Sequence, residues 1–267
     1  MKKMILIALF LIALGAAFFS GLQIYDFYHT QEVNNQQYED LKKEYSVDVE
    51  NVPVSEESSS ETTHENGSKK SPYDFGKLKQ ENEDIRGWIK IPDSLIDFPV
   101  VQGFDNSHYL SYGFDGNYNQ NGCPFLDYRT KQTDNNNVIH GHNMGTGSTP
   151  MFSTLIKYDD FDYYKKHEYF YYSSVFNSEN IDKYRIISVI HFYINDLSSF
   201  DYMQRKFETT KEINDWIKKA NSLSIYQITA PVVDRLEERQ IVTLSTCDRR
   251  EYGQSGRYLI VGIKENP

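Results

Sequence analysis

The sequence predicts a mainly β fold, a β-barrel or a sandwich with inserted helices, preceded by one transmembrane helix at the N-terminus. Short segments of alternating or β-branched residues recur from residue 72 onward, which is typical of strands. Turn-rich pieces such as DGNYNQNG and NMGTGSTP separate these segments. An uncharged run near the N-terminus predicts the membrane helix. The 267 residues contain no internal repeat, so we expect the strands to form one domain.

The N-terminal run begins after Lys2 and Lys3 and extends from Met4 to about Ile24. At 1.5 Å per residue it spans about 30 Å, the thickness of a bilayer core. A cleaved signal peptide has a shorter apolar region and a small-residue cleavage site, and LGAAFFSG is only a fair match to such a site. We therefore expect residues 1–28 to form a cytoplasmic tip and an uncleaved anchor that crosses the membrane through residues 4–24. The two lysines keep the N-terminus inside, which places the rest of the chain outside the cell.

Residues 29–71 predict an acidic, polar stalk between the membrane and the folded part. Residues 31–70 contain ten acidic residues and four lysines, a net charge of −6 out of −10 for the whole chain. The second half, SEESSSETTHENGSKK, has no apolar periodicity and predicts disorder, whereas the first half predicts a short helix through Tyr38, Leu41 and Tyr45. The acidic balance and the lack of a Lys/Arg cluster argue against nucleic-acid binding.

The folded part, residues 72–267, begins with a short helix that leads into a strand, YDFGKLKQENEDIRGWIKI. The next strand, LIDFPVVQG, has the half-buried pattern because Ile96, Phe98 and Val100 alternate with other residues. Later strands are expected at CPFLDYR, NNVIHGH, YFYYSSV, KYRIISVIHFYI, YQITA, RQIVTLSTC and RYLIVGIK.

One longer helix is expected at TTKEINDWIKKAN, between two of these strands. Thr209 and Glu212 have the spacing of a capping box, which satisfies free N–H groups at a helix start. The apolar residues that follow recur at the spacing of one helical face: Ile213, Trp216, Ile217 and Ala220.

Cys247 ends the alternating segment IVTLSTC and is followed at once by Asp248, Arg249 and Arg250. A structural cysteine prefers apolar neighbours, whereas a reactive cysteine prefers a partly open, electropositive position. A thiol attacks a carbonyl as the thiolate, so it needs a group that takes its proton or stabilises its charge. The second cysteine, Cys123, leaves open a disulfide between the two, which would exclude Cys247 as a nucleophile.

Two histidines, His140 and His142, end a predicted strand and precede the glycines of NMGTG. Alternate strand residues point the same way, and glycines allow sharp turns and the close approach of a substrate. A histidine here is the best candidate to exchange a proton with Cys247. The same pair also permits a metal hydrolase, in which His108 or Asp127 supplies a third ligand. That alternative leaves the cysteine without a role.

Arg257 enters the last apolar segment, GRYLIVGI, ten residues after Cys247. A turn through DRREYGQSG would fold the chain back as a hairpin and bring Arg257 beside Cys247. A guanidinium there stabilises a thiolate or hydrogen-bonds to a developing oxyanion. From the spacing alone, a surface charge at the edge of a strand is the competing interpretation.

The segment TLSTC, followed ten residues later by an arginine and preceded upstream by Gly-His after a strand, resembles the sortases, membrane-anchored cysteine transpeptidases of Gram-positive bacteria. NEDIRGWIKIPDSLIDFPVVQGFDNSHYL, NGCPFLDYR and NVIHGHNMGTGSTPMFSTL resemble class B, as does the helix-containing insert before YQITA. The resemblance covers about residues 73–263 and implies a closed sortase-type β-barrel with inserted helices. It implies that the nucleophile is Cys247, the catalytic histidine His142 and the essential arginine Arg257. It also implies substrate contacts at Asn106, Leu110, Tyr202, Met203, Ser245 and Thr246.

The resemblance further implies a reaction. The Cys247 thiolate would attack a threonine carbonyl in the C-terminal sorting signal of a surface protein, and an amine of peptidoglycan or of another protein would resolve the thioacyl enzyme. We expect an Asn-Pro-x-Thr-type signal rather than Leu-Pro-x-Thr-Gly, and no cofactor or metal. The catalytic domain is expected outside the cell on a single-pass anchor in the cell membrane.

Three further points stay open at the level of sequence. A sortase that polymerises pilins would have nearly the same sequence features. A catalytically silent surface binding module could keep the same barrel. Asp248, a position proposed as a third catalytic member in some class B enzymes, ranks below Arg257 because neighbouring strand residues point to opposite sides.

Overall fold

A computed structural model describes residues 2–46, 71–145, 151–177, 180–196, 199–237, 240–248, 250 and 253–265. The chain forms two compact units, residues 1–44 and 45–267. The first unit consists of helix α1, Lys2–Tyr45, whose N-terminal part is long and apolar enough to cross a membrane. The helix is continuous beyond residue 28, because residues 22–45 contain neither proline nor glycine. Residues 47–70, the rest of the expected stalk, lie outside the described residues.

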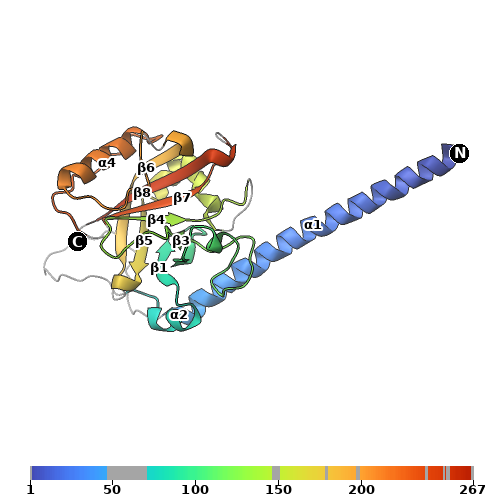
Figure 1. The fold of residues 1–267 in the computed structure, drawn as a ribbon, viewed down its shortest axis with the longest axis horizontal. Coiled ribbons are helices and arrows are strands. Elements are labelled where there is room, and N and C mark those ends of the chain that lie inside the picture. The colour runs from blue at the N-terminus through green and yellow to red at the C-terminus, as the bar shows by residue number, and fades with distance from the viewer. Residues whose placement is uncertain are drawn as a thin grey trace. The chain divides into compact units, whose positions relative to one another are not determined.

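The second unit is a β-barrel with helices inserted between its strands (Figure 1). The strands are β1 Ile85–Lys90, β2 Asp97–Val101, β3 Phe125–Leu126, β4 Asn136–His140, β5 Tyr169–Ser174, β6 Asp182–Tyr193, β7 Ile241–Cys247 and β8 Gly256–Lys264. The α-helices are α2 Phe75–Glu81, α3 Phe161–Lys166 and α4 Thr210–Ser222. Short 3-10 helices are η1 His108–Leu110, η2 Phe152–Asp159, η3 Val175–Asn177, η4 Ile194–Asp196 and η5 Gly253–Ser255.

The strands close into a barrel in the order β1-β2-β3-β4-β7-β8-β6-β5. Strands β2 and β3 pair in parallel, as do β4 and β7, and the other neighbours are antiparallel. The predicted fold class, a mainly β closed barrel with inserted helices and an apolar N-terminal helix, is confirmed.

The strand expected at YQITA, residues 226–230, is wrong, because this segment has no strand. A closed barrel offers no free edge with which a further strand could pair. The segment binds the end of α4 instead, where the Asn221 side-chain amide donates to the carbonyl of Ile228 at 2.6 Å and to that of Ile187 at 2.8 Å.

Helix α4 begins as the sequence predicts. The hydroxyl of Thr209 accepts a hydrogen bond from the N–H of Glu212 at 3.1 Å. The predicted apolar face is buried against the outer face of β6, β7 and β8, where α4 lies in Figure 1. Its buried members are Ile213, Trp216, Ile217 and Ala220.

Both faces of β7 are therefore covered. Residues such as Ile241 face the cluster under α4, which is the apolar face of α4 together with the apolar residues of the strands beneath it. The alternate residues of β7 face the inside of the barrel. From Ile241 to Thr246 every residue of β7 is buried, and only Cys247, the last residue of this fully described strand, is partly exposed. The strand thus carries the thiol from the core to the surface at the end of the barrel.

Candidate active site

Cys247 and Arg257 lie opposite one another in the pair of strands β7 and β8. The N–H of Asp248 donates to the carbonyl of Gly256 at 3.1 Å, so these two residues form a hydrogen-bonded pair. Cys247 and Arg257 are then the adjacent non-hydrogen-bonded pair, in which the side chains of one face are closest. The ladder therefore sets the guanidinium side chain beside that of the cysteine.

Both cysteines are free thiols. Cys123 is buried and its Sγ lies 3.7 Å from the carbonyl oxygen of Pro99, whereas Cys247 is partly exposed. The disulfide that the sequence left open is absent. The thiol at the end of β7 is accordingly not excluded as a nucleophile.

Two hydrogen bonds fix the turn that carries His142 to the end of β7. The N–H of Gly141, just beyond β4, donates to the carbonyl of Ser245 at 3.1 Å. The side-chain amide of Asn143 donates to the carbonyl of Cys247 at 2.9 Å. His142 is thus held between two residues that are each bonded to the last residues of the strand.

The ring of His142 is oriented by a contact outside the barrel strands. Its Nε2 lies 2.8 Å from the carbonyl oxygen of Leu110, at the end of η1. A carbonyl only accepts, so a neutral His142 donates from Nε2 and keeps its lone pair on Nδ1. This arrangement defines which nitrogen of the histidine can accept a proton.

Gly141 is required by a close approach. A Cβ at this position would lie 2.6 Å from the nearest ring carbon of Phe152, the first residue of η2. The backbone of Phe152 also donates its N–H to the carbonyl of His142 at 2.9 Å. The glycine therefore lets η2 pack directly against the histidine turn.

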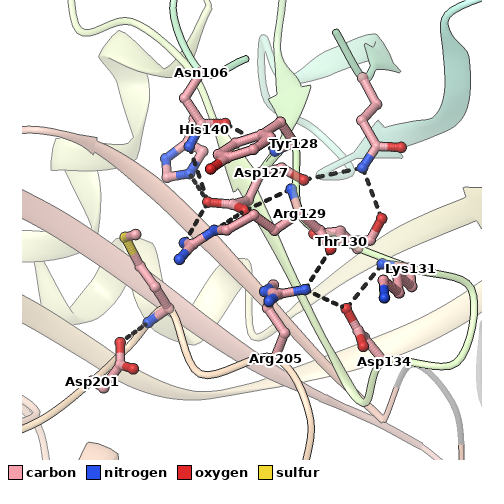
Figure 2. A network of polar contacts seen from close by, with 12 residues as sticks. Asn106, Asp127, Tyr128, Arg129, Thr130, Lys131, Asp134, His140, Asp201 and Arg205 are labelled. Carbon is pink, nitrogen blue, oxygen red and sulfur yellow. Dashed lines mark hydrogen bonds and ion pairs between the residues drawn. The ribbon is translucent and has the colours of Figure 1, made fainter. Parts of the chain in front are cut away.

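Asn106 belongs to a network of polar contacts around Asp127 (Figure 2). Its amide donates to Asp127 Oδ2 at 3.0 Å, and its carbonyl oxygen accepts the N–H of Tyr128 at 2.9 Å. Arg129 donates to the same carboxylate from Nε and from a terminal nitrogen, both at 2.8 Å. Burial would raise the pKa of Asp127, but the hydrogen bonds from Arg129 and Asn106 outweigh it and hold the pKa well below its usual range. The buried carboxylate thereby fixes the Asn106 side chain.

Tyr202 and Met203 belong to the segment between β6 and α4. The Tyr202 hydroxyl lies beside Ser245 and Arg257, and burial raises the pKa of this phenol. The backbone carbonyl of Tyr202 accepts a hydrogen bond from the Asn136 side chain at 3.2 Å. Met203 packs at the edge of the cluster under α4. This segment therefore covers the face of β7 on which Cys247 lies.

Ser245 and Thr246 occupy opposite faces of β7. Ser245 shares the face of Cys247, two residues along the strand. The Thr246 side chain is buried, and its hydroxyl donates to the carbonyl of Gly141 at 2.7 Å. Thr246 thus holds the histidine turn from the other side of the strand.

The Asp248 side chain is also directed away from Cys247. It is fully buried and accepts hydrogen bonds from Arg250 and His191. Burial would raise the pKa of Asp248, but these hydrogen bonds outweigh it and lower the pKa. The Asp248 carboxylate therefore faces His191 and Arg250, and its ranking below Arg257 stays a prediction.

The residues of the metal-hydrolase alternative do not converge. His140 Nε2 lies 3.9 Å from Asp127, whereas His142 is directed to the carbonyl of Leu110. The ring of His108 stacks on Tyr112 at a centroid distance of 4.4 Å. Within the described part of the chain, no three His, Cys, Asp or Glu side chains are grouped so as to hold a metal ion.

Sequence reasoning missed two residues that organise this region. Asn143 ties the histidine turn to Cys247, and the only signal for it is its place directly after Gly-His. Asp127 was considered only as a metal ligand, whereas it holds Asn106 and Arg129. Its signal is a single carboxylate that ends the apolar segment CPFLD.

Comparisons with known proteins identify the family. A family model described as the sortase domain matches residues 89–265. Sortase B of Listeria monocytogenes is 30% identical over 261 residues, which cover 96% of this chain and 94% of that protein. The crystal structure of sortase B from Bacillus anthracis in complex with AAEK1 superposes with a TM-score of 0.63 at 25% identity, covering 91% of this chain and 100% of that one. A Staphylococcus aureus sortase B–substrate complex gives a TM-score of 0.60 at 25% identity over 72% of this chain and 84% of that one.

The relatives and the solved structures thus share both the barrel and the class name. The matched region contains the strand-end cysteine, the Gly-His turn and the arginine of β8. The chain therefore belongs to the sortase family of cysteine transpeptidases, and within that family to the class B sortases.

Proposed function

We propose that this sortase cleaves a C-terminal sorting signal after threonine at Cys247 and transfers the protein to an amine of cell-wall peptidoglycan. The observation that carries the proposal is the non-hydrogen-bonded pair of Cys247 and Arg257, next to the turn that Asn143 bonds to the Cys247 carbonyl. A nucleophile, a cation and a histidine thereby meet at one end of the barrel. This set of groups suits acyl transfer through a thioester.

In the first half of the reaction the Cys247 thiolate attacks the threonine carbonyl carbon. The carbon–sulfur bond forms, and the negative charge that develops on the carbonyl oxygen is stabilised by the Arg257 guanidinium. The peptide bond after threonine then breaks, and His142 gives a proton to the leaving amine. The threonine remains attached to Cys247 as a thioester.

In the second half an incoming amine attacks the thioester carbonyl. His142 takes a proton from this amine, a new amide bond forms, and the carbon–sulfur bond breaks. Cys247 leaves as the thiolate that began the cycle. The cycle is redox-neutral, and Cys247, His142 and Arg257 supply its nucleophile, its proton transfers and the stabilisation of its developing charge.

The sorting signal would lie on the Cys247 face of β7. Tyr202 and Ser245 border this face, and Met203 follows in the same covering segment. Asn106 and Leu110 border the histidine side, where the Leu110 carbonyl contacts His142. The Staphylococcus aureus relative whose structure contains a substrate supports a peptide site in this fold. We propose an Asn-Pro-x-Thr-type motif for this chain.

The proposed organisation places the reaction at the outer surface of the cell membrane. Residues 1–28 form the anchor, residues 29–71 the acidic stalk and residues 72–267 the catalytic domain. The apolar part of α1 can span a bilayer, which supports this arrangement. The protein partners are surface proteins with a sorting signal, and the amine donor is a peptidoglycan precursor or cross-bridge.

A thioacyl trap tests the proposed reaction. The full chain in detergent is incubated with a panel of Asn-Pro-x-Thr and Leu-Pro-x-Thr-Gly peptides and hydroxylamine, and products are identified by mass spectrometry. We expect the threonine hydroxamate and an acyl-enzyme only with the Asn-Pro set. Cleavage of the Leu-Pro set alone would overturn the proposed motif.

Two cysteine variants identify the nucleophile in the same assay. Product should vanish with Cys247→Ala and persist with Cys123→Ala, whose thiol is buried in the core 3.7 Å from the carbonyl oxygen of Pro99. Absence of product and acyl-enzyme from a folded, reduced wild-type chain with every peptide would contradict the proposed reaction. It would favour a surface binding module instead.

A further inference from the structure

Behind the Cys247 face, a histidine joins two carboxylates at the end of the barrel. Asp248 is fully buried, and His191 Nδ1 on β6 lies 2.5 Å from its Oδ2. Its other oxygen accepts from the Nε of Arg250 at 3.0 Å. A charge this deeply buried is stable only when it is paired and hydrogen-bonded, and His191 and Arg250 supply those bonds.

The opposite nitrogen of His191 faces a second carboxylate. Nε2 lies 3.1 Å from Asp159 Oδ1, at the end of η2. The Asp159 carboxylate also accepts from a terminal nitrogen of Arg250 at 2.6 Å and from the Tyr258 hydroxyl at 2.9 Å. The four charged or titratable side chains therefore form a closed ring in which Asp248 and Asp159 alternate with His191 and Arg250.

This ring is complete only when His191 is protonated. A neutral imidazole has one N–H, so one of its nitrogens would present a lone pair to a carboxylate. The imidazolium donates from both nitrogens. Its positive charge and that of Arg250 also balance the two carboxylates, which leaves the ring neutral.

The groups that face His191 come from every element around it. Asp248 and Arg250 follow β7, Asp159 ends η2, and the ring of Tyr258 on β8 lies edge-on at a centroid distance of 5.0 Å. A further phenol, Tyr226 after α4, donates to the backbone carbonyl of Asp159 at 2.5 Å. Both tyrosines donate to Asp159, so neither competes with His191 as a base.

The ring is joined to the chain neighbours of the two residues at the site, one as a member and one as a donor to Asp159. Asp248 directly follows Cys247 and Tyr258 directly follows Arg257, and in extended strands neighbours point to opposite faces. We propose that protonated His191, held between Asp248 and Asp159, is a positioning residue that fixes Cys247 and Arg257 in the geometry needed for acyl transfer. The proposal rests on the proposed function of this site. It adds that His191, a residue outside the peptide face, controls the geometry of the site.

The first test compares His191→Gln with the wild-type full chain across about pH 5.5 to pH 9.5, which extends above the range of about pH 5 to 8 in which an ordinary imidazole titrates. At the acidic end we expect kcat of the variant about tenfold below wild type, with KM unchanged, because misplacement of the reacting groups lowers kcat. The ratio of kcat in the variant to kcat in the wild type should rise towards one at the basic end, where wild-type His191 has lost its second proton. A constant ratio at all pH values would overturn the proposal, since a merely structural histidine lowers activity equally throughout.

His167→Gln is the matched control. Both ring nitrogens of His167 also have a partner, but these partners are the main-chain carbonyls of Tyr163 and Asp93 rather than carboxylates of the ring. The ratio of kcat in His167→Gln to kcat in the wild type should not vary with pH. If His191→Gln does not fold, Asp159→Ala removes one carboxylate from the partly exposed edge of the ring and should give the same pH-dependent ratio.

Two readouts are independent of any peptide substrate. NMR of ¹⁵N-histidine-labelled protein at pH 7 should show N–H groups on both nitrogens of His191 in the wild type and on one in Asp159→Ala. Alkylation of Cys247 by iodoacetamide should show the same pH-dependent ratio of variant to wild type as kcat. A neutral His191 in the wild type, or equal alkylation ratios at all pH values, would overturn the proposal.

These readouts separate the two proposals. A doubly protonated His191 with pH-dependent alkylation, but with no transpeptidation of any peptide, would reject the proposed reaction and retain the positioning role. Transpeptidation with a pH-independent ratio would retain the reaction and reject the positioning role.

Discussion

Arg257 lies directly opposite Cys247 in a non-hydrogen-bonded pair of β7 and β8, although ten residues of chain separate them. The separation places both residues at the turn end of the hairpin ladder, where β7 leaves the core and β8 enters it. The arginine can therefore reach the thiol face without crossing the barrel. The register of the ladder places the two residues opposite one another.

Replacement of Arg257 tests this pairing. Arg257→Ala should lower kcat about 10²–10³-fold, the usual loss when one donor to a developing oxyanion is removed. Arg257→Lys keeps the charge but loses the planar, forked guanidinium, so its kcat should also be well below that of the wild type. Steady-state transpeptidation kinetics measure both, with Arg235→Ala, an exposed arginine paired with Glu237, as the control. Wild-type kcat in Arg257→Ala would mean that the residue is only a surface charge.

Loss of the Asn143 side chain should weaken catalysis more than folding. Asn143→Ala removes the bond from the histidine turn to the Cys247 carbonyl, and a loosened turn should lower kcat about tenfold through poorer orientation of His142. Steady-state transpeptidation kinetics measure kcat, and thermal unfolding verifies that the variant is folded. Asn117→Ala, which removes an exposed turn amide bonded to Asp115, should keep wild-type kcat. Equal losses in the two variants would contradict a role for this bond.

Gly141→Ala should destabilise the domain through overpacking. Its Cβ would lie 2.6 Å from the Phe152 ring, and forcing a methyl into a packed contact costs about 1–3 kcal/mol. Urea unfolding measures the free energy of unfolding. The double variant with Gly141→Ala and Phe152→Leu should lose less free energy of unfolding than the two single variants lose in sum. Purely additive effects would show that the clash with this ring is not the cause.

Asp127→Asn should reduce stability more at neutral pH than in acid. The pKa of the folded-state carboxyl lies well below its ordinary value of about 3.9, so its contribution is full above that value and declines as the pH falls from there towards the lowered pKa. The difference in unfolding free energy between wild type and variant should therefore narrow from pH 7 to pH 3. Urea titrations at several pH values measure it. A difference that stays constant with pH would show that the carboxylate charge contributes nothing.

Local signals of strands and turns predicted a barrel or a sandwich, and the resemblance to the sortases implied the closed barrel. The apolar face of α4, the Thr209 cap and the segment ending at Cys247 were all identified from neighbouring residues alone. The error at YQITA arose because the same local pattern occurs in a segment that reaches a barrel already closed. A β-rich composition indicates that a segment can pair, but it does not indicate whether a partner edge remains free.

The sequence by itself determined the residues available for chemistry: one strand-end thiol, an upstream Gly-His turn and an arginine ten residues further on. Only the tertiary structure decided which of them meet and what holds them. The amide of Asn143 reaches a carbonyl 104 residues away, and His191 reaches a carboxylate 57 residues away. Contacts of this kind depend on strand order and register, which are set by closure of the whole barrel. No short stretch of sequence contains that information, because the energy that fixes register is spread over the packed faces of every strand.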